Sequence, residues 1–267
     1  MRPEDAFAGI REKPTSHIKE VCHGGIGKIR KDSMSTNLAE NVVDLVELRD
    51  RVSVFRDRAH AGKVVAGMLY EYRNTNAIVL GIPAGGLPVA AVIAEELKVN
   101  LDVVVVSKIT LPWNTEAGYG AAAFDGTVRL NQRLVKGLKL SKGDIRQGIE
   151  KTSRKVAMRV TILRGERPFP DVSSAPVILV DDGLASGFTM LVGVEALRNA
   201  GARVIVVAVP TGHTNSVQMM ADHVEKLYCA NIRYGLSFAV ADAYGRWSDV
   251  SDDEVIDIVK HIREREF

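Results

Sequence analysis

The chain has 267 residues, of which 46% are hydrophobic and 25% charged, the balance of an ordinary soluble globular protein. With 35 basic and 33 acidic residues its net charge is only +2, so composition indicates neither a nucleic-acid nor a membrane partner. Only Cys22 and Cys229 are present, which excludes a disulfide scaffold and favours the cytoplasm, and no apolar stretch approaches the ~20 residues of a membrane span.

Prolines and glycines interrupt any periodic pattern in residues 1–40, so we expect an N-terminal extension there, mobile in solution, followed by one domain over residues 41–267. Apolar positions at helical spacing predict one broken or two consecutive amphipathic helices over residues 45–73. Beyond them, strand and helix patterns alternate. This alternation is typical of a mainly parallel sheet with helices on both faces.

The elements that follow are predicted from apolar runs, periodicity and turn residues. The predicted strands cover residues 77–82, 101–106, 177–181 and 203–209, with short strands near residues 120–130. The predicted helices cover residues 88–97, 142–163, 189–199 and 215–222. A loop is predicted over residues 107–119.

Residues 177–189 join an apolar run, two carboxylates and a turn of small residues. The run is short and β-branched, which predicts a buried strand of a parallel sheet. Asp181 and Asp182 then stand at its carboxyl end, where open α/β sheets bind ligands. The turn places the hydroxyls of Ser186 and Thr189 before a helix, together with backbone N–H groups and the positive end of the helix dipole. This arrangement predicts a phosphate site.

The same segment resembles the phosphoribosyl pyrophosphate (PRPP) signature of type I phosphoribosyltransferases, in which two acids precede a Thr/Ser-Gly-x-Thr turn. The resemblance implies that Asp181 and Asp182 hold the ribose hydroxyls of PRPP and that the turn wraps its 5′-phosphate. The turn residues so implied are Gly183, Leu184, Ala185, Ser186, Gly187 and Thr189. Gly183 departs from the family, which usually has a branched apolar residue there. A strand that merely ends in two acids and caps the next helix is the alternative.

A second turn, within residues 80–91, contains Ala84, Gly85 and Gly86. Adjacent glycines let the backbone approach a ligand closely with its N–H groups facing an anion. The segment resembles the family's pyrophosphate loop, in the Pro-Arg-Gly-Gly form of an uncharacterised bacterial and archaeal branch, with Ala84 in place of Arg. The resemblance implies that these three residues bind pyrophosphate. An ordinary strand-to-helix turn is the alternative.

Ser107 and Lys108 follow the next predicted strand, where the family often carries Arg-Lys. Residues 111–120 resemble the branch's Ala-Pro-Gly-Asn-Pro-Glu loop. The resemblance implies that Lys108 contacts pyrophosphate and that the loop closes over the site, which would shield the reacting sugar from water. A solvated lysine is the alternative. Residues 55–62 resemble the branch's Phe-x-Asp-Arg motif, and we expect ion pairs or a helix cap from its charges.

The resemblance implies a doubly wound, mainly parallel five-stranded sheet with helices on both faces, and a small hood from about residues 41–60 and 228–267. It also implies transfer of phosphoribosyl from PRPP to an unidentified nitrogenous acceptor, with Lys108, Asp181 and Asp182 as the catalytic residues. Mg²⁺ would be held mainly by ligand and water. A homodimer is implied as well.

Three alternatives accompany this interpretation. Tyr244 and Trp247 in the hood either stack on the acceptor or, as we favour, fill a small core. A regulator that binds PRPP without turnover is favoured by Ala84 and Ser107. A hydrolase of the α/β type is disfavoured, because Ser186 does not lie in the G-x-S-x-G elbow that such enzymes use.

Overall fold

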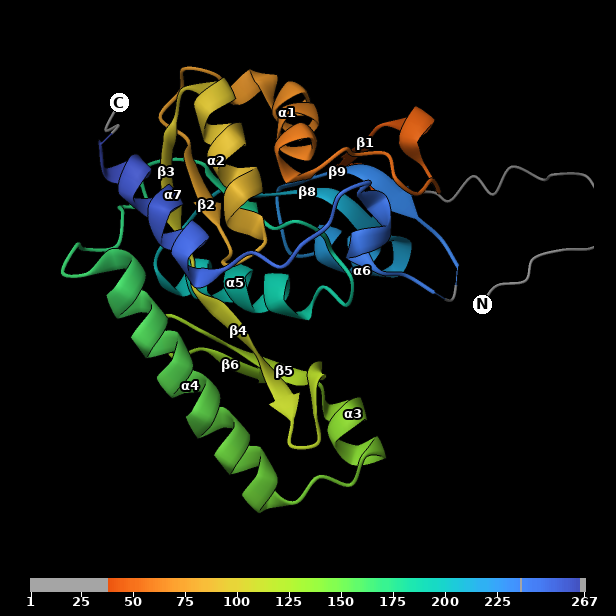
Figure 1. The fold of residues 1–267 in the computed structure, drawn as a ribbon, viewed down its shortest axis with the longest axis vertical. Helices are drawn as coiled ribbons and strands as arrows, with labels where there is room; N and C mark the ends of the chain where they lie inside the picture. The colour runs from red at the N-terminus through yellow and green to blue at the C-terminus, as the bar shows by residue number, and fades with distance from the viewer. Residues whose placement is uncertain (1–37, 236, 265–267) are drawn as a thin grey trace, which may run out of the picture. The chain divides into compact units, whose positions relative to one another are not determined.

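The computed structural model describes residues 38–235 and 237–264 (Figure 1). Residues 1–37, which make up nearly all of the expected N-terminal extension, lie outside the described residues. In the part of the chain that is described, no helix has the length and apolar character needed to cross a membrane.

The main sheet has six strands, all parallel, in the order β1-β9-β8-β7-β2-β3. Its strands are β1 Val42–Asp44, β2 Ile78–Gly81, β3 Asn100–Val103, β7 Val177–Val180, β8 Ile205–His213 and β9 Lys226–Arg233. The predicted α/β class and mainly parallel sheet are confirmed, with six strands rather than five. The neighbours β1 and β9 lie largely in residues expected to form the hood. With only three half-buried residues, β1 is too short to show a pattern in the sequence.

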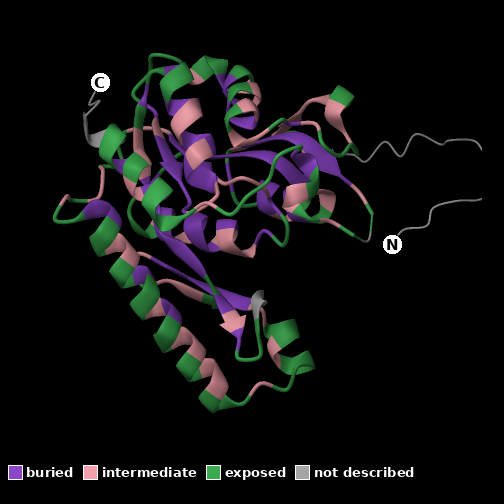
Figure 2. Cartoon of the chain, in the orientation of Figure 1, coloured by how far each residue is buried: buried purple, intermediate pink, exposed green. Residues whose placement is uncertain are grey.

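Helices cover both faces of this sheet. The α-helices are α1 Arg58–Met68, α2 Gly86–Leu97, α3 Gln132–Gly137, α4 Lys142–Arg164, α5 Phe188–Asn199, α6 Thr214–Ala221 and α7 Asp252–Glu264. One core packs α1 and α2 on the sheet, and another packs α5 and α6 on its opposite face. In β7, for example, Ile178 joins the first core and Leu179 the second. Figure 2 shows the strands of the main sheet largely in the purple of buried residues. Both faces of β7 are thus buried, which explains its continuous apolar sequence.

The helical pattern predicted over residues 45–73 is only partly present. One α-helix, α1, forms there, flanked by the short 3-10 helices Val46–Leu48 and Tyr70–Tyr72. Asp50 and Ser53 each have a φ of 52°, a left-handed conformation that a right-handed helix cannot contain. The apolar positions keep their helical spacing across this turn, although the backbone there is not helical, and this explains why the prediction was only partly right.

A separate antiparallel sheet of order β4-β5-β6 follows β3. Its strands are β4 Val106–Leu111, β5 Asn114–Ala123 and β6 Val128–Leu130. The loop predicted over residues 107–119 was wrong, because these residues form most of the β4-β5 hairpin. The single strand predicted over residues 101–106 is divided between the two sheets. Much of β5 is alanine and glycine, residues with a low strand preference, so its sequence carried little strand signal.

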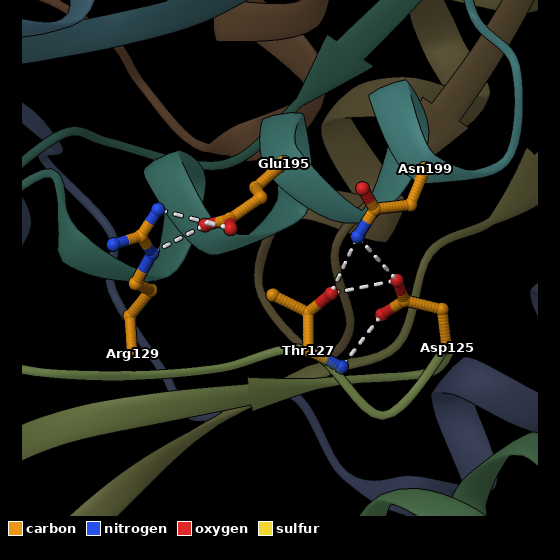
Figure 3. A network of polar contacts seen from close by, with 5 residues as sticks. All are labelled: Asp125, Thr127, Arg129, Glu195 and Asn199. Carbon is orange, nitrogen blue, oxygen red and sulfur yellow. Dashed lines mark hydrogen bonds and ion pairs between the residues drawn. The ribbon is translucent and has the colours of Figure 1, made fainter.

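Polar contacts join the antiparallel sheet to α5 (Figure 3). Arg129 of β6 donates two hydrogen bonds to the carboxylate of Glu195, at 2.6 and 3.0 Å. The amide of Asn199 donates to Asp125 and Thr127 in the β5-β6 turn, at 3.1 and 2.9 Å. The sheet that carries β4 is thereby held against the same helix whose start follows the paired acids.

Helix α4, predicted over residues 142–163, is confirmed. It begins at a capping box, in which Ser141 Oγ accepts the Asp144 N–H at 3.1 Å and the Asp144 carboxylate accepts the Ser141 N–H at 3.2 Å. Val156 and Leu163 are buried in a core that also holds residues of α2, β5 and α7. Figure 1 shows the helix running beside the antiparallel sheet.

Candidate functional site

The paired acids stand at the carboxyl end of β7, between the neighbouring strands β2 and β8. All four residues of β7 are buried, whereas Asp181 and Asp182 are half-buried. An Asp181 carboxylate oxygen accepts the Asp182 N–H at 2.9 Å, which fixes the first side chain against the backbone of the second. Their position matches the ligand-binding edge of a parallel sheet.

A cavity of about 130 Å³ opens beside these acids. Besides Lys108, Met190 and Val240, its lining consists of the acids and the turn: Asp181, Asp182, Gly183, Leu184, Ala185, Ser186, Gly187 and Thr189. Gly187, with a φ of 72°, leads into α5, and the Ser186 hydroxyl accepts the Phe188 N–H at 3.4 Å. The structure thus gathers every turn residue predicted from the sequence around one hollow at the start of a helix.

The second turn lies directly against the acids. A Cβ placed on Gly85 would fall 1.9 Å from an Asp182 carboxylate oxygen, and one on Gly86 would fall 2.7 Å from the Cα of Asp181. At Gly86 the backbone at the end of β7 leaves no room for a side chain, whatever ligand is bound, whereas at Gly85 a side chain would displace the Asp182 carboxylate. Ala84 is half-buried at the start of this turn.

Lys108 lies on β4 with its side chain exposed, and it lines the first cavity. It also lines a second cavity of about 300 Å³, together with both acids and Pro83 of the Gly-Gly turn. Lys108 is therefore the residue of β4 that lines both cavities. It stands on a strand and not at the start of a loop, and its contact with pyrophosphate stays a prediction.

Arg58, at the start of α1, forms an ion pair of the kind expected from the Phe-x-Asp-Arg motif, but the sequence did not reveal that its partner is Asp182 in the site. Its guanidinium bonds the Asp182 carboxylate at 2.9 and 3.0 Å, and its side chain is only 12% exposed. The Trp247 ring stacks on this guanidinium at 3.9 Å, and the Tyr244 hydroxyl donates to the Asp182 carbonyl at 2.6 Å. The expected helix cap is present in the next residue back, since Asp57 accepts the His60 N–H at 2.9 Å.

Comparisons with known proteins agree with this geometry. A model of the phosphoribosyl transferase domain matches residues 125–231, which include β7 and the turn after it. Two proteins from strains of Mycobacterium tuberculosis, MT0597 and Rv0571c, are each 33% identical over 205 residues, 77% of this chain and 46% of theirs. Both bear the provisional name of phosphoribosyl transferase. The chain belongs to the type I phosphoribosyltransferase family.

A solved structure extends the likeness to three dimensions. The protein TT1426 from Thermus thermophilus aligns with a TM-score of 0.63 and 29% identity, over 78% of this chain and 98% of that one. The chain spans about half the length of the curated relatives that it matches. The phosphoribosyltransferase fold therefore holds for most of this chain, whereas those relatives have further residues beyond it.

One departure from the phosphoribosyltransferase signature has a structural explanation. A Cβ on Gly183, where the family usually has a branched residue, would lie 2.5 Å from a methyl group of Val240. Val240 begins the 3-10 helix Val240–Ala243, and it lines the first cavity. Val240, from the C-terminal segment, thus fills the space that the branched residue of the signature usually fills from the end of the strand.

Burial is the largest influence on the pKa values of Asp181 and Asp182 in this phosphoribosyltransferase site. Burial raises the pKa of Asp181 well above its usual range, and the neighbouring charge of Asp182 raises it further. Burial also raises the pKa of Asp182, although Arg58 and, more weakly, Lys108 oppose that shift. Burial thus disfavours the ionised form of both carboxyl groups, and a cation or a hydroxyl donor favours it, as Arg58 does for Asp182.

Replacing Arg58 by Met is expected to destabilise the protein by about 1–3 kcal/mol at pH 7, because a half-buried carboxylate loses its ion pair. The pKa of Asp182 in the folded protein would rise further. A carboxyl group whose pKa is raised by folding stabilises the protein fully below its ordinary pKa, and this stabilisation is lost as pH rises. The stability difference between Arg58→Met and the unmodified protein should therefore shrink as pH falls toward about 4. Denaturant unfolding at several pH values measures this, with Arg133→Met, at an exposed arginine of α3, as the control. A deficit that does not vary with pH would contradict the role given to Asp182.

Proposed function

We propose that the chain is a phosphoribosyltransferase that transfers the phosphoribosyl group of PRPP to a nitrogenous acceptor. The observation that carries this proposal is the first cavity, which unites the paired acids with the turn at the start of α5. The family supports transferase chemistry, and this hollow supplies a place for a sugar phosphate. The donor, the acceptor and the turnover itself are the proposal.

Each part of the site has a chemical role in this reaction. The carboxylates of Asp181 and Asp182 accept hydrogen bonds from the ribose hydroxyls. These bonds stabilise the ionised forms, which burial disfavours. The turn residues 183–187 and Thr189 surround the 5′-phosphate, beside the positive end of the α5 dipole. Lys108 lies where the pyrophosphate would leave and balances its charge.

The reaction breaks the bond from C1 of the ribose to pyrophosphate oxygen and forms a bond from C1 to the acceptor nitrogen, whose proton passes to solvent. We include Mg²⁺ in the proposal. Within the described residues, no group of three or more acidic, histidine or cysteine side chains could hold a metal by itself. Two adjacent carboxylates beside a phosphate ligand fit Mg²⁺, which keeps several waters and uses few protein ligands. When bound, the ion would neutralise charge on the pyrophosphate.

A second candidate function is a regulator that binds PRPP without turnover. Ala84 favours it, because the turn against the acids carries no side-chain cation at this position for a leaving pyrophosphate. The paired acids and the first cavity serve both functions equally.

One experiment separates the two. PRPP binding is measured by calorimetry with Mg²⁺, and pyrophosphate release is measured with a panel of purine, pyrimidine and other nitrogenous acceptors. We expect binding together with release for one class of acceptor. Binding without release on any acceptor would favour the regulator, and no PRPP binding would refute both.

A further inference from the structure

The second cavity differs from the first in its charge. Its volume is about 300 Å³, and three cationic side chains line it: Lys108 of β4 and Lys155 and Arg159 of α4. The first cavity has only Lys108. Both cavities are lined by the paired acids and Thr189, so they adjoin each other across the end of β7. A ligand with two separated anionic groups could reach into both.

Lys155 and Arg159 are spaced four residues apart on α4, so their side chains project from one face of the helix. The buried side chain of Val156 fixes this part of α4 against the protein. The positions of the two cations are therefore set by a packed helix and not by a free loop. A helix presents such groups to a ligand with less loss of conformational entropy than a mobile segment would.

The cations remain available to a ligand. Lys155 is exposed and, in the part of the chain that the structure describes, makes no ion pair. Arg159, whose side chain is 19% exposed, pairs with Asp252 at 2.5 Å, and that carboxylate is 79% exposed. Water solvates the Asp252 carboxylate once it is released, so a ligand anion can replace it at the guanidinium. Among the acids of the cavity, Asp182 already has Arg58 as its partner.

We propose that the second cavity is the pyrophosphate compartment of the donor site, and that Lys155 and Arg159 of α4 bind the pyrophosphate there. This inference rests on the proposed function. It assigns to α4 the side-chain charge that the Gly-Gly turn lacks at Ala84, while Pro83 of that turn forms part of the same wall. Lys108, between the cavities, contacts the donor where its sugar and pyrophosphate parts meet.

The test uses two probes that report on the compartments separately, in Mg²⁺ buffer by calorimetry: inorganic pyrophosphate and ribose 5-phosphate. The variant K155Q/R159Q is compared with K151Q/R154Q, which removes the same charge from exposed positions of the same helix outside the cavity. We expect K155Q/R159Q to weaken pyrophosphate binding about 10- to 100-fold, the effect of losing two charge-assisted contacts, and to leave ribose 5-phosphate binding within about twofold. The control variant should bind both probes as the unmodified protein does.

Equal pyrophosphate affinity in K155Q/R159Q and the unmodified protein would overturn the inference, as would an equal loss in both variants, since that would reflect only the long-range field of the helix. The proposed function would survive either result if PRPP still bound in a manner dependent on Asp181. If the unmodified protein bound neither probe nor PRPP, the proposed function and the inference would both be wrong.

Discussion

The variant Asp181→Asn should lose PRPP affinity by about 10- to 100-fold and, at neutral pH, be more stable than the unmodified protein by about 1–2 kcal/mol. The affinity falls because an amide is a weaker acceptor for ribose hydroxyls than a carboxylate. The stability rises because a charge that is held in a poorly solvated place beside Asp182 is removed. The Asn oxygen can still accept the Asp182 N–H, so the local hydrogen bond at 2.9 Å is kept.

The gain in stability should depend on pH in a defined direction. The folded-state pKa of Asp181 lies above its ordinary value of about 3.9, so the folded protein binds this proton more tightly than the unfolded chain does. The stability that this carboxyl contributes is full below about pH 4 and is lost as pH rises through the folded-state pKa. The advantage of the Asn variant should therefore vanish near pH 4, grow as pH rises, and be complete above the folded-state pKa.

Thermal unfolding at several pH values, together with calorimetric titration of PRPP, measures both effects. Asp249→Asn is the matched control, because it removes an exposed carboxylate from the C-terminal segment and should change neither quantity. An Asp181→Asn variant that melts lower at neutral pH would contradict the electrostatic argument. Unchanged PRPP affinity would show that Asp181 is not in the donor site.

The strand of the site and its acids could be predicted because their signals are local. The β7 run is apolar on both faces, and the acids, turn and helix follow within a dozen residues. Most of the residues that line the cavity beside them belong to this segment, and the others are Lys108 of β4 and Val240 of the C-terminal segment.

The remaining parts of the site depend on contacts between distant residues, which periodicity and spacing do not encode. Arg58 is 124 residues from its partner Asp182, and α4 reaches the second cavity through packing against the antiparallel sheet. Gly183 departs from the family signature, and only the structure shows that the Val240 side chain, from the C-terminal segment, occupies the space of the missing side chain. The β4-β5 hairpin was missed because alanine and glycine are poor indicators of a strand.

The two glycines of the second turn should respond differently to alanine. At Gly86 the added Cβ would lie 2.7 Å from both the Cα of Asp181 and the carbonyl oxygen of Val180. These are backbone atoms at the end of a buried central strand, which cannot yield without moving the sheet. Gly86→Ala is therefore expected to destabilise the protein by about 1–3 kcal/mol or more, the usual effect of overpacking a tight core.

At Gly85 the added Cβ would meet the end of the Asp182 side chain, 1.9 Å away. That carboxylate can rotate, but only by leaving the Arg58 guanidinium at 2.9 Å. Gly85→Ala should thus lose PRPP affinity by about tenfold or more, the loss expected when a charge-assisted contact is misplaced, with a smaller loss of stability than Gly86→Ala. Denaturant unfolding and PRPP calorimetry on both variants separate the two effects.

Gly67 provides the control for these substitutions, because it lies exposed within α1 and a Cβ there has no atom within 4 Å. Gly67→Ala should leave PRPP binding unchanged and stabilise the protein by about 0.5–1 kcal/mol, since alanine is the better helix former. If Gly85→Ala bound PRPP normally, the Asp182 carboxylate could not be needed in its present position. If Gly86→Ala were as stable as Gly67→Ala, the close approach of the second turn to β7 would be wrong, and with it the pairing of the two turns in one site.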